Sequence, residues 1–256
     1  YDYKSYIIRS RDSFDLNINQ PYNTQPLPEL VNVTTNDREQ LKSQAFFVQD
    51  QIRITDRLNT LIAMRFENYK QDYSNFVNNS SWSTDNNAFI PRVGLTYDLT
   101  DQLTVYSNIS KSFKPNSGAD RNNQGFDPEE GISYEIGSKY ALLDNQLSFD
   151  TAMYYVKKEN VLTLDPLDFT KSIAAGEVTS KGIDLSLVGN ITPAWKIIGN
   201  YSYVDAAVSK DNTLAKGTRL ANIPQDSFNL LSIYEFKSGA LNGLGLGVNQ
   251  RYVGSR

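Results

Sequence analysis

The chain has 256 residues, a formal net charge of −4, 39% apolar residues and 12% aromatic residues. It contains no histidine and no cysteine, which excludes disulfides, imidazole or thiolate metal sites and Ser-His-Asp catalysis within it. The acidic balance, without any run of Lys or Arg, argues against a nucleic-acid partner. The apolar fraction lies below the roughly 45–50% of soluble domains, so the composition suits a wall with one apolar and one hydrated face.

No stretch of about 18 apolar residues is present, so the sequence predicts no transmembrane helix. The mean hydropathy is −0.47. This value remains compatible with a membrane, because a barrel strand needs only about 10 residues with every second one apolar.

Tight-turn signals recur about every 45 residues along the chain, and polar loops rich in Gly, Asn and Pro lie between them. The turns are Thr55-Asp56-Arg57, Thr100-Asp101-Gln102, Leu143-Asp144-Asn145, Ile191-Thr192-Pro193 and Ser238-Gly239-Ala240. The loops cover about 11–37, 73–87, 115–128, 161–176 and 209–223. Short turns that alternate with long loops are typical of an outer-membrane barrel, which has short periplasmic turns and long extracellular loops.

The segments between turns and loops alternate with a period of two residues, as strands do. Within 58–67, Ile62 and Phe66 lie on one face, and Ala63 and Arg65 lie on the other. We expect about 11 strands of about 10–15 residues, twice the average of about 5–6 in soluble proteins. The same pattern recurs in segments 131–140, 146–156, 182–188 and 244–252.

Aromatic residues gather near the ends of these strands, where barrels carry their interfacial girdles. Trp195 and Phe228 are expected beside turns, and Tyr97 lies beside the turn at Asp101. An alternative is that Tyr and Phe are simply frequent in strands. The pattern fails at Asp50, which alternation places on the apolar face, and at a strand over 195–204 whose Ile198 and Val204 fall on the polar face. Asp50 is expected near the periplasmic rim.

Several motifs follow one another in a recognisable order at the spacing of barrel hairpins. The most specific block is Asp127-Pro128-Glu129-Glu130-Gly131 with Tyr134-Glu135-Ile136-Gly137-Ser138-Lys139. The other blocks are Phe47-Val48-Gln49-Asp50-Gln51, Ile90-Pro91-Arg92-Val93-Gly94-Leu95, Tyr106-Ser107-Asn108-Ile109-Ser110-Lys111-Ser112-Phe113-Lys114-Pro115, Ala152-Met153-Tyr154-Tyr155, Lys158-Glu159-Asn160-Val161-Leu162-Thr163-Leu164-Asp165-Pro166, Ala175-Gly176-Glu177 and Ser180-Lys181-Gly182-Ile183-Asp184-Leu185. Together these blocks resemble the barrel of TonB-dependent siderophore receptors, over essentially the whole chain.

The resemblance implies an all-β, antiparallel transmembrane barrel of about 22 strands around an N-terminal plug. Residues 1–256 then form a partial barrel domain of about 11 strands that lacks the plug, the early strands and the final strands. It also implies a monomeric receptor in the bacterial outer membrane, in contact with lipid. Such a receptor imports ferric siderophores, driven by a TonB-type partner that acts through the plug. It needs neither a cofactor nor protein metal ligands, because the siderophore itself supplies the ligands of the iron.

Ligand contacts are expected from aromatic residues in the long loops or at the outer ends of strands. The candidates are Tyr22, Tyr73, Trp82, Phe113 and Phe126. For each, the alternative is loop packing or a place in the outer aromatic belt. The acidic cluster Asp127, Glu129 and Glu130 is interpreted as a solvated junction between a loop and a strand. The inward charges of the hydrated wall are expected at Arg53, Arg65, Glu135, Lys139 and Asp150.

Four other functions compete with ferric siderophore import. The same receptor type could carry cobalamin, haem or a sugar. A passive porin-type channel also has long loops and a polar lumen, but it lacks the motif block over 127–139. An outer-membrane lipase or protease is disfavoured, because no histidine and no pair of nucleophile and base is present, so we expect no enzyme. A soluble β-sandwich adhesin would not partition into detergent.

Overall fold

The computed structural model describes residues 2–11 and 30–255. It contains eleven strands and one short 3-10 helix in the order of the chain. The elements are β1 (Asp2–Arg11), β2 (Leu30–Arg53), β3 (Leu58–Asn75), β4 (Ser80–Asp98), β5 (Leu103–Lys114), β6 (Glu129–Leu142), β7 (Leu147–Asp165), β8 (Asp168–Thr192), β9 (Trp195–Lys210), β10 (Asp226–Glu235), η1 (Gly239–Leu241) and β11 (Gly245–Val253). No helix among the described residues is long and apolar enough to span a bilayer.

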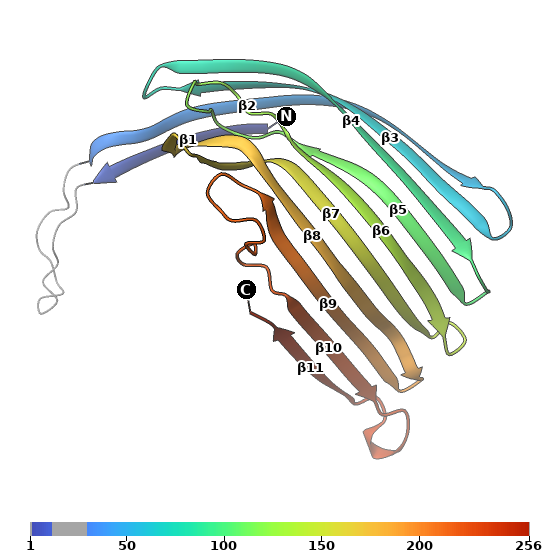
Figure 1. The fold of residues 1–256 in the computed structure, drawn as a ribbon. Coiled ribbons are helices and arrows are strands. Elements are labelled where there is room, and N and C mark those ends of the chain that lie inside the picture. Colours follow the sequence, from blue (N-terminus) through green and yellow to red (C-terminus); the bar gives the residue numbers. More distant parts are fainter. Residues whose placement is uncertain (1, 12–29, 256) are drawn as a thin grey trace, which may run out of the picture.

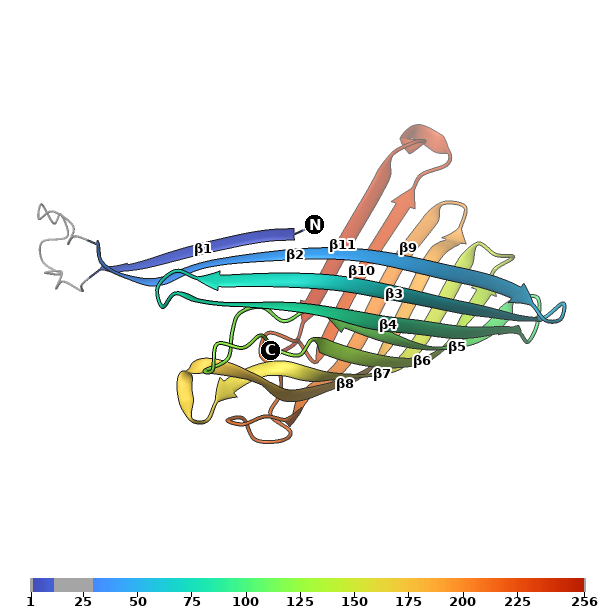
Figure 2. The same cartoon turned by 90° about the horizontal axis from the view of Figure 1, so that it is seen from above.

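The strands form one antiparallel sheet in which each strand pairs with its neighbours in the sequence, from β1 to β11. Figures 1 and 2 show a single twisted and curved wall. The two longest described loops, 115–128 and 211–225, lie at one end of the strands, and the four-residue turns at 54–57, 99–102 and 143–146 lie at the other. The expected all-β antiparallel fold and the expected strand number are confirmed. Strand lengths were predicted too short, because the observed strands range from 9 to 25 residues.

The two faces of the wall differ in chemistry, as the alternation predicts. On one face Phe46, Phe66 and Phe89 lie directly opposite one another across β2, β3 and β4, and all three are highly exposed. On the other face Arg65 lies opposite Phe47 and Ile90. The five charges predicted to share the hydrated face do so in the observed register: Arg53, Arg65, Glu135, Lys139 and Asp150.

Aromatic residues form two rows on the apolar face, one near each end of the strands. On β4 the two rows are represented by Phe89 and Tyr97, eight residues apart. At about 3.3 Å per residue this is about 26 Å along the strand, close to the apolar band of about 25 Å in outer-membrane barrels. Trp195 opposite Tyr234 belongs to the row beside the short turns, whereas Phe228 lies at the long-loop end opposite Tyr201. Phe228 was therefore assigned to the wrong end of its strand.

The short turns repeat one local device. Thr55 Oγ1 accepts hydrogen bonds from the backbone N–H groups of Arg57 and Leu58, at 3.3 and 3.0 Å. Thr100 Oγ1 does the same for the residues two and three positions later, at 3.2 and 3.0 Å. A hydroxyl that satisfies turn N–H groups explains why Thr recurs there. The expected turn at 238–240 is instead a longer connection that contains η1.

Two predicted loops are mostly strand. β3 and β4 continue to a four-residue turn at 76–79, and β7 and β8 leave only residues 166 and 167 between them. Both regions look loop-like in sequence because they extend beyond the apolar band, where strands carry many polar residues. The loops predicted over 115–128 and 209–223 are present, the second of them at 211–225. The predicted loop over 11–37 lies largely outside the described residues.

The register also settles the two irregular strands. Asp50 shares its face with Phe46 and Ile52 and lies opposite Ile62, so a carboxylate does lie on the apolar face. Ile198 lies opposite Val188 and Leu231, on the polar face. Alternation therefore sets the orientation of each strand even where individual side chains do not match their face.

Candidate functional site at the long-loop end of the wall

The β5–β6 loop, residues 115–128, lies against the polar face of β3 and β4. The side-chain Nε2 of Gln71, a buried residue of β3, donates a hydrogen bond to the Asn116 carbonyl at 2.8 Å. Asn78, in the turn between β3 and β4, donates to Asn123 Oδ1 at 3.3 Å. The loop is thus tied to the wall near its start and near its tip.

A buried polar network closes the base of this loop. Asn116 Nδ2 donates to the carbonyls of Asp127 and Asn160, at 2.7 and 2.8 Å. Asn160 Nδ2 in turn donates to the Pro128 carbonyl at 2.9 Å. Asn160 has a φ of 57° and sits at a register shift in the β7–β8 pairing, a left-handed conformation that Asn tolerates. The Asn116 side chain therefore joins the start of the loop to its end and to β7, and the Asn160 side chain fixes the end of the loop to β7 a second time.

Two pairs of aromatic rings fill the space between wall and loop. Tyr73 stacks on Trp82, with ring centroids 5.6 Å apart and planes 17° from parallel. Tyr69 meets Phe113 at 5.0 Å. Tyr69 and Tyr73 are only 1% and 7% exposed, so these rings already have partners within the protein.

The tyrosines of this cluster stay protonated. Burial raises the pKa of Tyr69 above its usual value of 10.0, and burial likewise raises the pKa of Tyr73. A neutral phenol is a poor ligand for a hard metal ion. Among the described residues no group of three or more Asp, Glu, His or Cys could hold a metal ion. The described aromatic cluster therefore contains packed, neutral phenols and no phenolate that could bind a metal ion.

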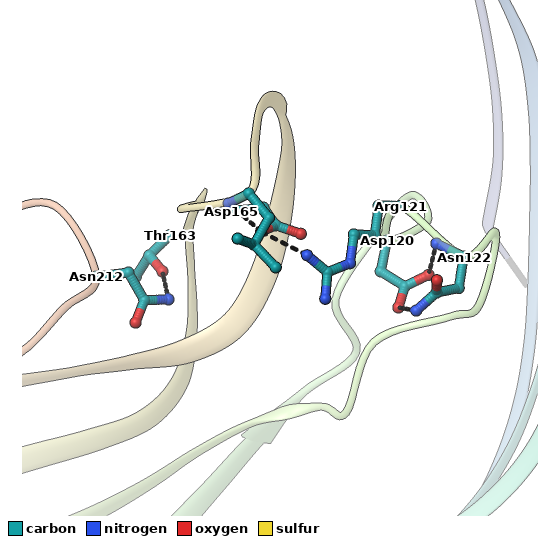
Figure 3. Close-up of polar contacts among 7 residues, drawn as sticks. Asp120, Arg121, Asn122, Thr163, Asp165 and Asn212 are labelled. Carbon is teal, nitrogen blue, oxygen red and sulfur yellow. Dashed lines mark hydrogen bonds and ion pairs between the residues drawn. The ribbon is translucent and has the colours of Figure 1, made fainter.

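A second set of contacts joins three loops (Figure 3). Arg121, in the β5–β6 loop, reaches the β7–β8 hairpin, where its Nη1 lies 3.3 Å from Asp165 Oδ1. Asn212, in the β9–β10 loop, donates to Thr163 Oγ1 at 3.2 Å. Thr163 and Asp165 are both buried. The apex of the β7–β8 hairpin thus lies between the two longer loops and contacts both.

The acidic cluster predicted at the start of β6 is a junction between loop and strand, as expected. Glu129 Oε1 forms an ion pair with Lys158 Nζ of β7 at 2.8 Å. Also on β7, Lys157 forms ion pairs with Glu159 of the same strand and with Glu177 of β8, at 2.7 and 2.8 Å. The hydrogen bonds that Lys157 donates to Glu159 and Glu177 raise the pKa of Lys157. These ion pairs link strands above the aromatic row and do not form a metal site.

The whole chain, residues 1–256, matches the family model described as TonB dependent receptor-like, beta-barrel. The chain belongs to the TonB-dependent receptors. It is 40% identical to the metal-pseudopaline receptor CntO of Pseudomonas aeruginosa over 97% of its own length, but covers only 36% of that relative. It is 30% identical to the ferrichrome outer membrane transporter/phage receptor of Escherichia coli, covering 94% of this chain and 31% of that protein.

Solved structures of receptors share the fold of this chain. The alcaligin outer-membrane receptor FauA of Bordetella pertussis matches with a TM-score of 0.70 at 25% identity, over 86% of this chain and 38% of that one. The ferric-catecholate import receptor Fiu of E. coli matches with a TM-score of 0.73 at 23% identity, over 98% and 40%. The chain thus spans well under half the length of these proteins.

Membership of this family assigns an environment to each face and each end of the wall. TonB-dependent receptors are outer-membrane proteins, so the apolar face with its two aromatic rows meets lipid. The polar face meets the lumen, and the short turns are periplasmic in barrels of this kind. The clustered loops over 115–128, 166–167 and 211–225 are therefore extracellular.

The predicted ligand contacts have different surroundings in this receptor. Tyr22 lies outside the described residues. Tyr73 is buried against Trp82, and Trp82, Phe113 and Phe126 are half-buried. The structure brings Tyr73 and Trp82 together, and places Phe113 in the neighbouring pair with Tyr69.

Sequence reasoning missed the polar residues that join the loops: Asn116, Arg121, Thr163, Asp165 and Asn212. Thr163 and Asp165 fall within the motif block over 158–166, but neither that block nor any periodicity predicts that these residues join loops. The apolar side chains at the β7–β8 apex were missed as well. Leu167 and Phe169 are 76% and 67% exposed there, well beyond the aromatic row.

Gly125 should be essential to the seating of the β5–β6 loop. An alanine Cβ there would lie 2.9 Å from two ring atoms of Trp82, and that ring cannot retreat because it stacks on buried Tyr73. We expect Gly125→Ala to lift the loop and to speed trypsin cleavage after Arg121 in the folded receptor about tenfold, consistent with an overpacking cost of about 1–3 kcal/mol. Gln124→Ala, an exposed neighbour, is the control. Equal cleavage rates in the two variants would contradict this packing.

Proposed function

We propose that this chain forms part of the barrel wall and outer mouth of a receptor that imports ferric siderophores across the outer membrane. A TonB-type protein in the periplasm drives the transport, acting through a plug inside the barrel. The observation that carries the proposal is the family match over residues 1–256. Relatives named as ferrichrome and ferrioxamine B receptors support the cargo class.

The mouth itself suits a cargo that brings its own metal ligands. Its tyrosines are buried and protonated, and the described residues offer no cluster of metal-binding side chains. A chelate that already saturates its metal needs only shape, hydrogen bonds and aromatic contact from the protein.

A second cargo is favoured by a specific observation. The relative at 40% identity is named a metal-pseudopaline receptor, whereas the ferrichrome and ferrioxamine B receptors are 30% and 28% identical. A metal chelate other than a ferric siderophore is therefore the main alternative. Cobalamin, haem, a sugar and passive diffusion through a porin-type channel remain as further alternatives for the test.

The test is uptake of radiolabelled metal by cells that carry or lack the gene encoding this chain. Cells starved of iron, or of divalent transition metals, receive hydroxamate, catecholate or carboxylate chelates, with the proton gradient intact or collapsed. We expect gene-dependent uptake of one ferric chelate class that stops when the gradient collapses. Uptake of only non-ferric chelates would move the assignment to the alternative cargo. Gene-dependent leakage that survives gradient collapse would refute active import.

A further inference from the structure

The apex of the β7–β8 hairpin contains a carboxylate in an unusual position. The Asp165 side chain is only 5% exposed, yet it lies at the extracellular end of the wall. Its Oδ1 accepts the Leu167 backbone N–H at 2.8 Å and the Arg121 guanidinium at 3.3 Å. A buried carboxylate is strongly disfavoured unless hydrogen bonds and an opposite charge compensate for its lost hydration. Arg121 supplies the charge from a different loop.

Arg121 is held in place by its own turn. Asp120 Oδ1 accepts the backbone N–H groups of Asn122 and Gln124, both at 2.8 Å. This compact turn fixes the loop tip, so that Arg121 can reach Asp165 while Asn123 bonds to the β3–β4 turn. The loop tip therefore contacts both the β3–β4 hairpin and the β7–β8 hairpin, and its own hydrogen bonds hold its conformation.

The β9–β10 loop attaches to the same hairpin by a similar arrangement. Asp211 Oδ1 accepts the N–H groups of Thr213 and Leu214, at 2.7 and 2.9 Å. Asn212, inside this turn, donates to buried Thr163, two residues before Asp165. Two self-capped turns from different loops thus meet on one hairpin apex, one on each side (Figure 3).

We propose that the β5–β6 loop, the β7–β8 apex and the β9–β10 loop form one rigid clamp, with the Arg121–Asp165 ion pair as its joint. Asp165 is a positioning residue that acts through Arg121 and does not touch cargo. The clamp holds the loop that covers the Tyr73–Trp82 stack at a fixed place in the mouth. The statement about cargo affinity rests on the proposed function, whereas the coupling of the three loops does not.

The two partners of the joint should respond differently to substitution. Arg121→Gln leaves a buried carboxylate without a cation, so the apex must open to hydrate it. Asp165→Asn leaves an arginine that is already 40% exposed and that water can solvate, and the new amide oxygen can still accept the Leu167 N–H. Arg121→Lys keeps the charge. We expect the contact between the β5–β6 loop and the β7–β8 apex to weaken most in R121Q, less in D165N and little in R121K.

Hydrogen exchange of the intact receptor in detergent, without cargo, tests the coupling. Arg121→Gln should speed amide exchange about tenfold or more, both at 120–124 and at 211–214, although Arg121 contacts neither Asp211 nor Asn212. By reciprocity, Asn212→Ala should speed exchange at 120–124. Lys216→Gln, an exposed cation of the β9–β10 loop, is the matched control. Exchange that rises only at the substituted loop would overturn the clamp, as would an equal effect of R121K and R121Q.

Uptake kinetics give the second readout. In R121Q we expect the half-saturating chelate concentration to rise about tenfold or more while the maximal rate stays within about twofold, with R121K restoring the wild-type value. A fall in maximal rate with unchanged half-saturation would overturn the positioning role. If wild-type cells import no chelate at all, the proposed function fails, and the hydrogen-exchange result still decides whether the clamp exists.

Discussion

Gly137→Ala is expected to prevent most of the receptor from reaching its folded barrel. A Cβ at this position of β6 would meet the Thr151 backbone carbonyl and would lie 2.6 Å from the Tyr106 ring, which covers Gly137 from the opposite strand. The carbonyl belongs to β7, which pairs with β6 here, so it cannot move without disrupting the ladder. Overpacking against backbone should cost about 3 kcal/mol.

The measurement is the fraction of receptor that keeps the compact, heat-sensitive mobility of a folded barrel in unboiled gels, compared with total receptor. Gly94→Ala and Gly199→Ala are matched controls, because a Cβ there would have its nearest contacts at 3.8 and 3.6 Å. Tyr106→Ala in the Gly137→Ala background should restore only part of the folded fraction, since the Thr151 carbonyl stays in place. Normal folding of Gly137→Ala alone would show that the strands separate more easily than this geometry implies.

The wall could be predicted from the sequence because its chemistry repeats at short range. Period-two alternation gave the face of each side chain, and the Thr-Asp turns gave the ends at the periplasm. Alternation failed to give strand lengths. Beyond Phe66, β3 continues through Asn68, Lys70 and Asp72, which are polar because this face of the strand meets water there. On the opposite face of the same segment, Tyr69, Gln71 and Tyr73 are buried. A polar strand and a polar loop then look alike in sequence.

The mouth was much less predictable. The Tyr73–Trp82 stack follows from the β3–β4 register, in which these residues lie directly opposite each other, but both had been placed in a loop. The Arg121–Asp165 contact joins residues 44 positions apart. It depends on how the 115–128 loop folds back onto the wall, and neither periodicity nor a local motif specifies that. Long-range polar contacts of this kind require the three-dimensional arrangement.

Ile136→Arg should destabilise the receptor in lipid far more than Ser133→Arg on the same strand. Ile136 is 61% exposed on the apolar face, between Ser107 and Met153, whereas Ser133 lies on the polar face opposite Ser110. Arginine near the middle of the lipid-facing band of a barrel costs about 2–4 kcal/mol, and a lumenal arginine can stay hydrated.

Denaturant titration of both variants folded into lipid vesicles compares the two faces directly. We expect the unfolding midpoint of Ile136→Arg to fall well below that of the wild type and the midpoint of Ser133→Arg to remain close to it. The native residue Lys139, which lies on the same face of β6 as Ser133, already shows that the polar face accepts a cation. Equal losses in the two variants would mean that both faces of β6 are equally dry, which would contradict a wall with lipid on one side and a hydrated lumen on the other.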